Sequence, residues 1–503
     1  MTIGVGGAVL LALMLRVMNI FDAPIRTDEP TITLRAVAAA QGQLVPSGFD
    51  YPPFAAYVLA VVLRLVAVVD PDVLVDPYPV SRLVFLVLSC VGVGLVGWLG
   101  VLVGGEDPRR RLLFGVGSAV ALAVSFSNVR LGAHARPDQV QLLTTVFALI
   151  ATILWSRIRS MRWLVLAGVG AGLAAATKYV GGVVVLTTVA AILAAHGRDW
   201  RTSVRDTTLF GAVSMVFFVI GTAGTVIIDT PGFIAGFTGE FSHQAGRHLG
   251  YEPNGNALVF HLTQSLPGNW GWPMTIAALA GIGLSVWQGS RAERLIVIFA
   301  VTGMGFAILS QVRFPHYVLL ALPALAILAM VTVDRLWRLD MRAGVAVLLL
   351  LVVSLVPVSF NAIRSGRVLG APSTQDLAIP LENVYSDELV IEAYTARGVD
   401  RVATLYTVAD DPSLVTCGCV VAISSYQEDR YRNRPDLYPD QIAAYDQIRD
   451  VGEQIGGVSP GRPLAYNWDL LPQWGIGDIP LTGDIGPVGP AISLWRMPAA
   501  SGG

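Results

Sequence analysis

The sequence predicts a mainly α-helical, polytopic membrane protein with about eleven transmembrane helices and a small α/β domain outside the membrane. Three observations support this fold class. First, 54% of the 503 residues are hydrophobic and 14% are charged, a balance typical of integral membrane proteins. Second, apolar runs of spanning length recur up to residue 360, and arginine clusters occupy alternate loops. Third, the apolar runs beyond residue 364 become short and rich in β-branched residues.

A helix needs about 20 mostly apolar residues to cross a bilayer. The candidate spans are 4–21, 81–103, 112–129, 138–156, 163–177, 180–196, 208–228, 274–288, 295–310, 318–333 and 343–360. The first span is expected to stay attached, because it lacks a basic leading segment and Arg16 interrupts it. The apolar segment 54–69 carries Arg64 and follows two prolines, so we expect a helix lying at the interface.

Arginine-rich loops set the expected topology. Five clusters lie on one side of the membrane if Met1 is cytoplasmic, and the excess of positive charge makes that side the cytoplasm. The clusters are 109–111, 157–162, 198–205, 291–294 and 335–342. The outer side then receives the loops 22–80 and 229–273 and everything after residue 361. Five of the six histidines fall on that side, which predicts a polar cavity at the outer face of a plasma-membrane protein.

Residues 1–363 are expected to form the membrane domain, and residues 364–503 a domain outside the cytoplasm. In the second part, β-branched runs such as 419–423 alternate with helix-like segments such as 439–451. This alternation is typical of a small α/β domain.

The three cysteines are expected to be structural. Cys417 and Cys419 are separated by one glycine, which is too short for a comfortable bridge, and two ligands alone make a weak metal site. Cys90 lies within an apolar run.

An acidic pair, Asp28 and Glu29, directly follows the first span. Carboxylates close to a bilayer are costly unless they have a function. The pair could be an ordinary solvated loop or the start of a helix. Its position at the membrane boundary favours a role on a lipid-borne substrate.

A second polar cluster, Arg136-Pro137-Asp138, opens the fourth span on the same side. Pro137 suits a first helical turn and Asp138 could simply stabilise the helix dipole. The functional alternative is a second carboxylate facing the same cavity. Arg130, His134 and Arg136 would then suit an anionic ligand.

Other outer-side residues offer cations and aromatic rings. Lys178 is the only lysine in the chain. It could snorkel at a helix end, or bind a phosphate as a point charge. Arg313, His316 and Tyr317 fit phosphate or sugar contact, and equally an interfacial aromatic belt. A polar segment with His243 and Arg247 suits ligand binding; its histidines could hold a metal, but their spacing is not diagnostic.

Short motifs occur along the chain in a defined order and topological placement. They are 15–19 (LRVMN), 28–29 (DE), 51–57 (YPPFAAY), 81–83 (SRL), 134–138 (HARPD), 172–179 (GLAAATKY), 424–426 (SSY) and 429–431 (DRY). Together they resemble the C-fold (GT-C) glycosyltransferases of the dolichyl-phosphate-mannose protein mannosyltransferase type, whose prokaryotic relatives include the aminoarabinose transferases. The resemblance covers the membrane region well and the C-terminal domain loosely.

The resemblance implies transfer of a hexosyl or pentosyl group from a polyprenyl-phosphate donor to an acceptor hydroxyl at the outer face, with inversion. Asp28 matches the first acidic position of the family pair and is expected to be the general base. Glu29 is expected to orient the acceptor or help to bind a cation. The expected partners are the lipid-linked donor, a lipid, glycan or protein acceptor and membrane lipids, with no nucleic acid.

The expected chemistry needs a base for the acceptor hydroxyl and cations for the departing phosphate. Lys178 and Arg313 are the leading candidates for the phosphate, with His316 as a helper. No cofactor is required by these residues, and a divalent metal is left open. A transporter or flippase of lipid-linked glycans is the alternative function. It explains the many spans, but not an outer soluble domain or carboxylates away from the middle of the membrane.

Overall fold

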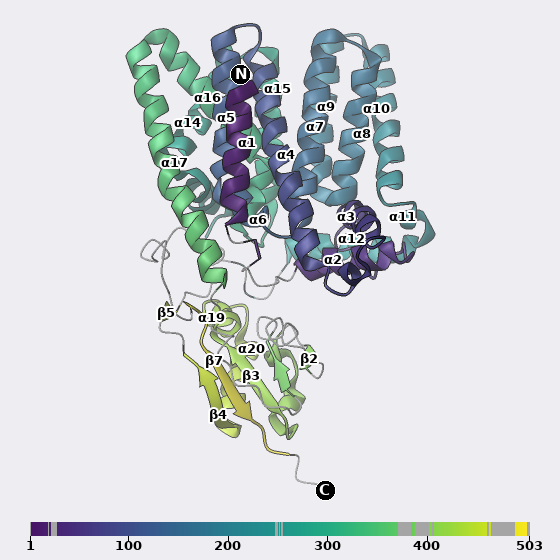
Figure 1. Cartoon of the computed structure of the whole chain (residues 1–503), viewed down its shortest axis with the longest axis vertical. Helices are drawn as coiled ribbons and strands as arrows, with labels where there is room; N and C mark the ends of the chain where they lie inside the picture. Colours follow the sequence, from purple (N-terminus) through teal and green to yellow (C-terminus); the bar gives the residue numbers. More distant parts are fainter. Residues whose placement is uncertain are drawn as a thin grey trace.

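The computed structural model describes residues 2–18, 20–21, 28–246, 250, 252, 255–370, 384–387, 402–404, 407–459, 462–463 and 488–499. A helical bundle forms the larger part, and a smaller α/β region lies beyond one of its ends (Figure 1). The N-terminal helix begins at the opposite end of the bundle, far from the α/β region (Figure 1).

The bundle contains a helix for each predicted span, as the periodicity of the apolar runs indicates. Its helices are α1 (Thr2–Val17), α4 (Tyr78–Gly104), α5 (Pro108–Val124), α7 (Pro137–Ile158), α8 (Met161–Thr177), α9 (Val184–His196), α10 (Trp200–Gly221), α14 (Leu266–Gln288), α15 (Arg291–Leu309), α16 (Leu322–Leu339) and α17 (Met341–Gly370). Six segments of the described chain are long and apolar enough to cross a membrane. They comprise α4, α7, the segment Tyr179–His196, α10, α15 and α17 up to Arg364. The protein is therefore a multi-pass membrane protein, and crossing by the other bundle helices stays a prediction.

Close helix packing depends on small residues at the crossing points. A Cβ atom at Gly281 on α14 would lie 1.9 Å from the carbonyl oxygen of Leu328 on α16. A Cβ atom at Gly100 on α4 would lie 2.4 Å from the carbonyl oxygen of Phe114 on α5. Glycine at these positions lets the backbones of neighbouring helices approach closely. Within a membrane, packing rather than water exclusion drives helix association.

Shorter helices gather at the end of the bundle that faces the α/β region (Figure 1). They include α2 (Asp28–Ala40), α3 (Phe54–Val66), α11 (Thr225–Ile228) and α12 (Thr230–Ala245), with the short helix η1 (Pro71–Leu74). The helix α3 has 13 residues and is therefore about 20 Å long, less than the hydrocarbon thickness. This length agrees with an interfacial helix in the predicted segment 54–69.

Breaks between the long helices supply the remaining turns at this end. They are α6 (Phe126–Leu131), η2 (Tyr179–Val183), α13 (Ala257–Phe260), the π-helical turn η3 (His261–Ser265) and η4 (Pro315–Leu320). Arg16 of α1 fixes one of these breaks from a fully buried position. Its guanidinium donates to the carbonyl oxygens of Ala123 and Asn128, at 3.2 and 3.3 Å, where α5 gives way to α6.

The far end of the bundle carries a network of arginines around two buried carboxylates. Arg109 Nη2 lies 2.6 Å from Asp334 Oδ1, and Arg110 Nη2 lies 2.6 Å from Glu293 Oε1. Arg335 also pairs with Glu293, at 3.5 Å. Three of the predicted arginine-rich loops therefore meet on one side of the protein.

The α/β region contains a five-stranded sheet in the order β2-β1-β3-β7-β4. The strands are β1 (Val384–Ser386), β2 (Val402–Thr404), β3 (Val420–Ser424), β4 (Glu453–Val458) and β7 (Ile492–Arg496). The first three pair in parallel, and β7 runs antiparallel to both β3 and β4. A smaller parallel pair is formed by β5 (Arg462–Pro463) and β6 (Val488–Gly489).

The helices α19 (Ser425–Arg432) and α20 (Pro439–Val451) and the turns η6 (Val408–Asp410) and η7 (Pro412–Thr416) accompany this sheet. Every residue of β3 is buried, as expected for a central strand of β-branched residues. The sheet confirms the predicted α/β class of the C-terminal region. The preceding helix α17 continues past the expected boundary at residue 364 to Gly370.

The two parts of the protein meet at the loop between α12 and α13. The Tyr438 hydroxyl donates to Glu252 Oε2 at 2.9 Å, and Arg434 donates to the backbone carbonyl oxygen of Glu252. This contact joins the α/β region to the connection between α10 and α14 that also carries α12.

The prediction that Cys417 and Cys419 are too close for a bridge is wrong. The two residues form a disulfide, with their Cα atoms 5.1 Å apart. Gly418 between them has a φ of +62°, a left-handed conformation that turns the chain back on itself at low cost for glycine. Cys90 is a buried free thiol.

Candidate functional site

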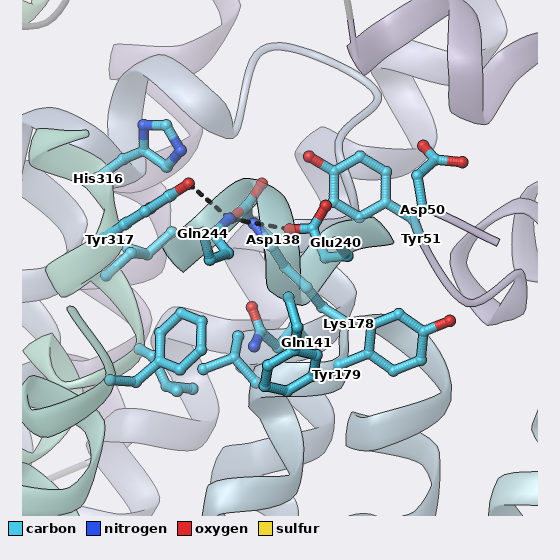
Figure 2. A pocket seen from close by; sticks show the side chains of 15 residues that line it. Asp50, Tyr51, Asp138, Gln141, Lys178, Tyr179, Glu240, Gln244, His316 and Tyr317 are labelled. Carbon is cyan, nitrogen blue, oxygen red and sulfur yellow. Dashed lines mark hydrogen bonds and ion pairs between the residues drawn. The ribbon is translucent and has the colours of Figure 1, made fainter. Parts of the chain in front are cut away.

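A cavity opens where α7, α12, η2, η4 and the segment between α2 and α3 come together (Figure 2). Its wall combines carboxylates, amides, one lysine and several aromatic rings. The lining residues are Asp50, Tyr51, Asp138, Gln141, Lys178, Tyr179, Val180, Glu240, Phe241, Gln244, Phe306, His316, Tyr317, Leu319 and Leu320.

Lys178 places a positive charge in the wall of this cavity. The residue follows the last turn of α8 in an extended conformation, which turns its side chain toward α7. Its Nζ atom lies 3.1 Å from Asp138 Oδ1. The same ammonium lies 5.4 Å from the ring centroid of Tyr51 and 5.9 Å from that of Tyr317. Aromatic faces stabilise a cation without neutralising it. The Lys178 ammonium is therefore stabilised by the Asp138 carboxylate and by the rings of Tyr51 and Tyr317.

Asp138 is linked to Asp28 through Arg136. Arg136 forms an ion pair with Asp28 Oδ2, and its Nε atom lies 3.9 Å from Asp138 Oδ2. The Tyr51 hydroxyl donates to Asp28 Oδ1 at 3.4 Å. Asp28 is one-fifth exposed and sits behind Tyr51 and Arg136, outside the cavity lining itself. The structure thus brings four predicted site residues together from α2, α7 and the end of α8.

Glu29 belongs to a separate, fully buried network. Arg82 Nε and Nη2 donate to its two carboxylate oxygens at 2.7 and 2.8 Å. His134 Nδ1 lies 3.3 Å from Oε2, and the Ala135 N–H donates to Oε1 at 3.3 Å. Burial alone would raise the pKa of Glu29, but the hydrogen bonds from Arg82 and His134 outweigh it and lower this pKa to about 2. Both oxygens are occupied by protein donors, and Glu29 does not line the cavity.

The α12 side of the cavity carries a hydrogen-bonded chain. Gln244 Nε2 donates to the Tyr317 hydroxyl and to Glu240 Oε1, both at 2.9 Å (Figure 2). Glu240 and Gln244 are four residues apart and therefore share one face of the helix. Tyr317 is a predicted site residue.

His316 also lines the cavity, whereas Arg313 does not. The His316 ring stacks on Phe314 with 5.3 Å between the ring centroids. Burial, together with the nearby cation Arg136, lowers the pKa of His316 well below its usual range, so the imidazole is neutral at pH 7. Arg313 is buried on another side, where burial and the charge of Arg434 lower its pKa.

For two further predicted residues, His243 and Arg247, the position of the side chain is not described. His243 lies in the helix α12, and its side chain is outside the described residues, as is all of Arg247. Within the described ranges, no group of three or more His, Cys, Asp and Glu side chains is arranged to hold a metal ion.

Six polar lining residues were not among the predicted site residues. They are Asp50, Tyr51, Gln141, Tyr179, Glu240 and Gln244. Tyr51 lies in the YPPFAAY motif, and Gln141 lies one helical turn after Asp138, so both carried a usable signal. For Glu240 and Gln244 the only sequence signal was their spacing of four residues, which is a helical spacing. The sequence predicted a polar loop here, so this signal was not used.

Comparison with known proteins identifies a matching family model and similar solved structures. The family model "Dolichyl-phosphate-mannose-protein mannosyltransferase" matches residues 110–223, which include Arg136, Asp138 and Lys178. The crystal structure of ArnT from Cupriavidus metallidurans bound to undecaprenyl phosphate is similar, with a TM-score of 0.52 and 16% identity, covering 86% of this chain and 94% of that one. The same ArnT in the apo state gives a TM-score of 0.50 over the same coverage, also at 16% identity.

No curated protein sequence matches the chain. The partial family match and the shared fold confirm the resemblance to mannosyltransferases and to ArnT that the motifs indicate. The chain has the GT-C fold.

Proposed function

On this likeness, we propose that the chain is a membrane glycosyltransferase that moves a monosaccharide from a polyprenyl-phosphate donor to an acceptor hydroxyl at the outer face. One observation carries the proposal: the chain of charges from Lys178 through Asp138 and Arg136 to Asp28, beside a cavity at the end of the bundle. The similar ArnT structure is bound to undecaprenyl phosphate, which supports a polyprenyl phosphate as the leaving group.

The reaction breaks one bond at the anomeric carbon and forms another. The acceptor hydroxyl oxygen attacks this carbon and transfers its proton to the Asp28 carboxylate. The bond from the anomeric carbon to the phosphate oxygen breaks, and its electron pair stays on the phosphate. Attack opposite to the departing phosphate inverts the configuration, as in inverting glycosidases. The proton held by Asp28 then returns to solvent.

Asp28 is suited to the role of general base by its partial exposure next to Tyr51, a residue of the cavity wall. Its two oxygens contact Tyr51 and Arg136, which fix the carboxylate without removing it from solvent. A partly exposed carboxylate can receive an acceptor from outside while the donor lies within the cavity. A base within hydrogen-bond reach of the attacking hydroxyl is the geometric requirement of this chemistry.

Lys178 is the cation that we assign to the donor phosphate. It lines the cavity, and its aromatic neighbours leave its charge available to a ligand. Fixed positive charge in a poorly hydrated cavity stabilises the negative charge that develops on the leaving phosphate. The neutral His316 and the Tyr317 hydroxyl are the lining groups that could donate hydrogen bonds to the same oxygens. Arg313, the second candidate from the sequence, lies outside this cavity, and its contribution stays a prediction.

Glu29 acts, in this proposal, as a positioning residue. Its carboxylate ties α2 to Arg82 of α4 and to the turn at His134 and Ala135. This turn leads directly to Arg136, the partner of Asp28. The buried network therefore holds both members of the Asp28–Arg136 pair in place.

The outer location is part of the proposal. The arginine network at the far end of the bundle marks the cytoplasmic side under the positive-inside rule, so the cavity and the region 364–503 face outward. The cavity lies beside the short interfacial helices and not midway along the bundle, where transporter sites are found. This placement favours the transferase over the flippase.

The proposal is tested by incubating the purified chain in detergent with a panel of polyprenyl-phosphate sugars and candidate acceptors. A transferase releases free polyprenyl phosphate and a glycosylated acceptor in equal amounts. Movement of the intact lipid-linked sugar across proteoliposomes, with no cleavage from any donor of the panel, would favour the flippase instead.

A further inference from the structure

The deep end of the cavity contains an amide whose N–H groups are not fully hydrogen-bonded within the described part of the chain. Gln141 lies on α7 one turn beyond Asp138, about 4.5 Å further along the helix axis. Its side chain lines the cavity at 5% exposure (Figure 2). Its Nε2 group has no hydrogen-bond partner among the residues that the structure describes. A buried amide donor without an acceptor costs free energy, so such a group needs an explanation.

The α12 side of the cavity offers a complementary acceptor. Asp50 and Asp138 each pair with a cation, Arg35 and Lys178 respectively. Glu240 forms no ion pair in the described part of the chain and accepts one hydrogen bond, from Gln244. Its carboxylate therefore keeps acceptor capacity inside the cavity (Figure 2).

We propose that Gln141 and Glu240 bind hydroxyl groups of the donor's sugar ring and thereby determine which sugar is transferred. This inference rests on the proposed function, because it places the donor phosphate at Lys178. A sugar attached to that phosphate must lie within one ring width of the lysine. The amide donates to a hydroxyl or ring oxygen, and the carboxylate accepts from a hydroxyl.

The surrounding aromatic and apolar residues also suit the faces of a sugar ring. Tyr51 and Tyr179 contribute aromatic surface, and Val180, Phe306 and Leu319 close the cavity with apolar side chains. A site built to hydrogen-bond a particular hydroxyl rejects analogues that lack it, because its own polar groups are then left unpaired. Gln141 and Glu240 are thus specificity-determining residues, distinct from the groups that handle the proton and the phosphate.

A neighbouring glutamine provides a matched control. Gln139 on the same helix is fully buried, and neither of its amide atoms has a hydrogen-bond partner within the described ranges. It does not line the cavity. Burial without a partner is therefore not diagnostic by itself, and what distinguishes Gln141 from Gln139 is its place in the cavity wall.

The test compares donors and variants together. Gln141→Leu, Glu240→Gln and Gln139→Leu are assayed in detergent with a polyprenyl-phosphate hexose and its monodeoxy analogues, and kcat/KM is measured for each pair. The parent should lose about 10-fold or more on the analogue that lacks the contacted hydroxyl. Gln141→Leu should show a similar loss with the complete sugar and little further loss with that analogue. Glu240→Gln should show the same pattern of kcat/KM, but with the analogue that lacks a different hydroxyl. Gln139→Leu should discriminate between the donors like the parent.

A second readout separates sugar contact from structural damage. Binding of polyprenyl phosphate without a sugar should be unchanged in Gln141→Leu, since the lost contact is to the sugar alone. An equal loss with every donor, or unchanged discrimination in both variants, would overturn the inference while leaving the proposed function intact. If the parent transferred no sugar from any donor, the proposed function would fail and this inference with it.

Discussion

Lys178 Nζ lies 3.1 Å from Asp138 Oδ1, although the two residues are 40 positions apart in the chain. The contact joins the end of α8 to the first turn of α7. It places the only lysine of the sequence in the wall of the cavity. Asp138 fixes the ammonium from one side, so a ligand phosphate can approach it from the other.

Removal of the Lys178 charge should weaken donor binding. In Lys178→Met the KM for a polyprenyl-phosphate sugar should rise about 10-fold or more, since hydrogen bonds to charged groups contribute about 1.5–3 kcal/mol. The double variant Lys178→Met/Asp138→Asn avoids an unpaired buried carboxylate and should show the same loss. Arg313→Ala should have a smaller effect, because Arg313 does not line the cavity. If the Lys178 variants bound the donor like the parent, Lys178 would not be the cation that binds the phosphate.

Loss of the Glu29 charge should affect stability first. Glu29→Gln leaves the buried Arg82 guanidinium without its counter-ion, and breaking such a pair typically costs about 3–5 kcal/mol. Thermal unfolding in detergent should show a marked drop in the midpoint. The paired variant Glu29→Gln/Arg82→Met should recover part of it. A stable single variant with parental unfolding would show that the network does not support the fold.

Low pH should reduce the stability of the folded protein through protonation of Glu29. The pKa of Glu29 is about 2 in the folded protein, because the hydrogen bonds from Arg82 and His134 outweigh burial, against an ordinary value of 4.5. Its contribution to stability is therefore complete above pH 4.5 and is lost as the pH falls toward 2. Unfolding measured across this window should show a steeper acid loss in the parent than in Glu29→Gln. Parallel curves would contradict the assignment.

The α/β region should show the opposite pH dependence around Asp387. This fully buried carboxylate accepts hydrogen bonds from the Ser424 N–H at 2.9 Å and the Tyr445 hydroxyl at 3.0 Å. Burial dominates and raises the pKa of Asp387 to about 6 from 3.8. The folded state then holds a proton that the unfolded state releases, so stability is highest below pH 4 and falls as the pH rises to 6.

Hydrogen exchange in β1 and β3 of the full chain measures this dependence directly. Protection of these strands should decrease between pH 4 and pH 6, after correction for the intrinsic exchange rate. Asp387→Asn should abolish the trend, because it removes the titrating group. A constant protection in the parent would place the pKa of Asp387 near its ordinary value.

The contact between the two parts of the protein should depend on Tyr438. Tyr438→Phe removes the donor to Glu252 Oε2, a net loss of about 1 kcal/mol. Hydrogen exchange should rise at residues 255–260 and 434–438 and stay unchanged in the central helix α16. Exchange that rises equally throughout the chain would indicate general destabilisation and not a local contact.

Hydropathy and charge alternation predict the bundle well, because each span must satisfy its own backbone in lipid. Asp28, Arg136, Asp138 and Lys178 could be grouped from the sequence, since all lie at span ends on one side. The partner of Glu29 could not be predicted, because Arg82 is 53 residues away and only tertiary packing brings the two together. Glu240 was missed for a similar reason: its place in the cavity depends on how α12 folds back over the bundle.

Single-turnover sugar transfer by Asp28→Asn tests the central claim most directly. The substitution is nearly isosteric, and Asp76→Asn serves as the matched control, because Asp76 is an exposed carboxylate between η1 and α4. With a polyprenyl-phosphate donor bound at saturation, the account predicts that Asp28→Asn transfers sugar about 10²–10⁴-fold more slowly, with donor binding unchanged and Asp76→Asn like the parent. Transfer by Asp28→Asn at the parental rate would contradict the assignment of Asp28 as the general base.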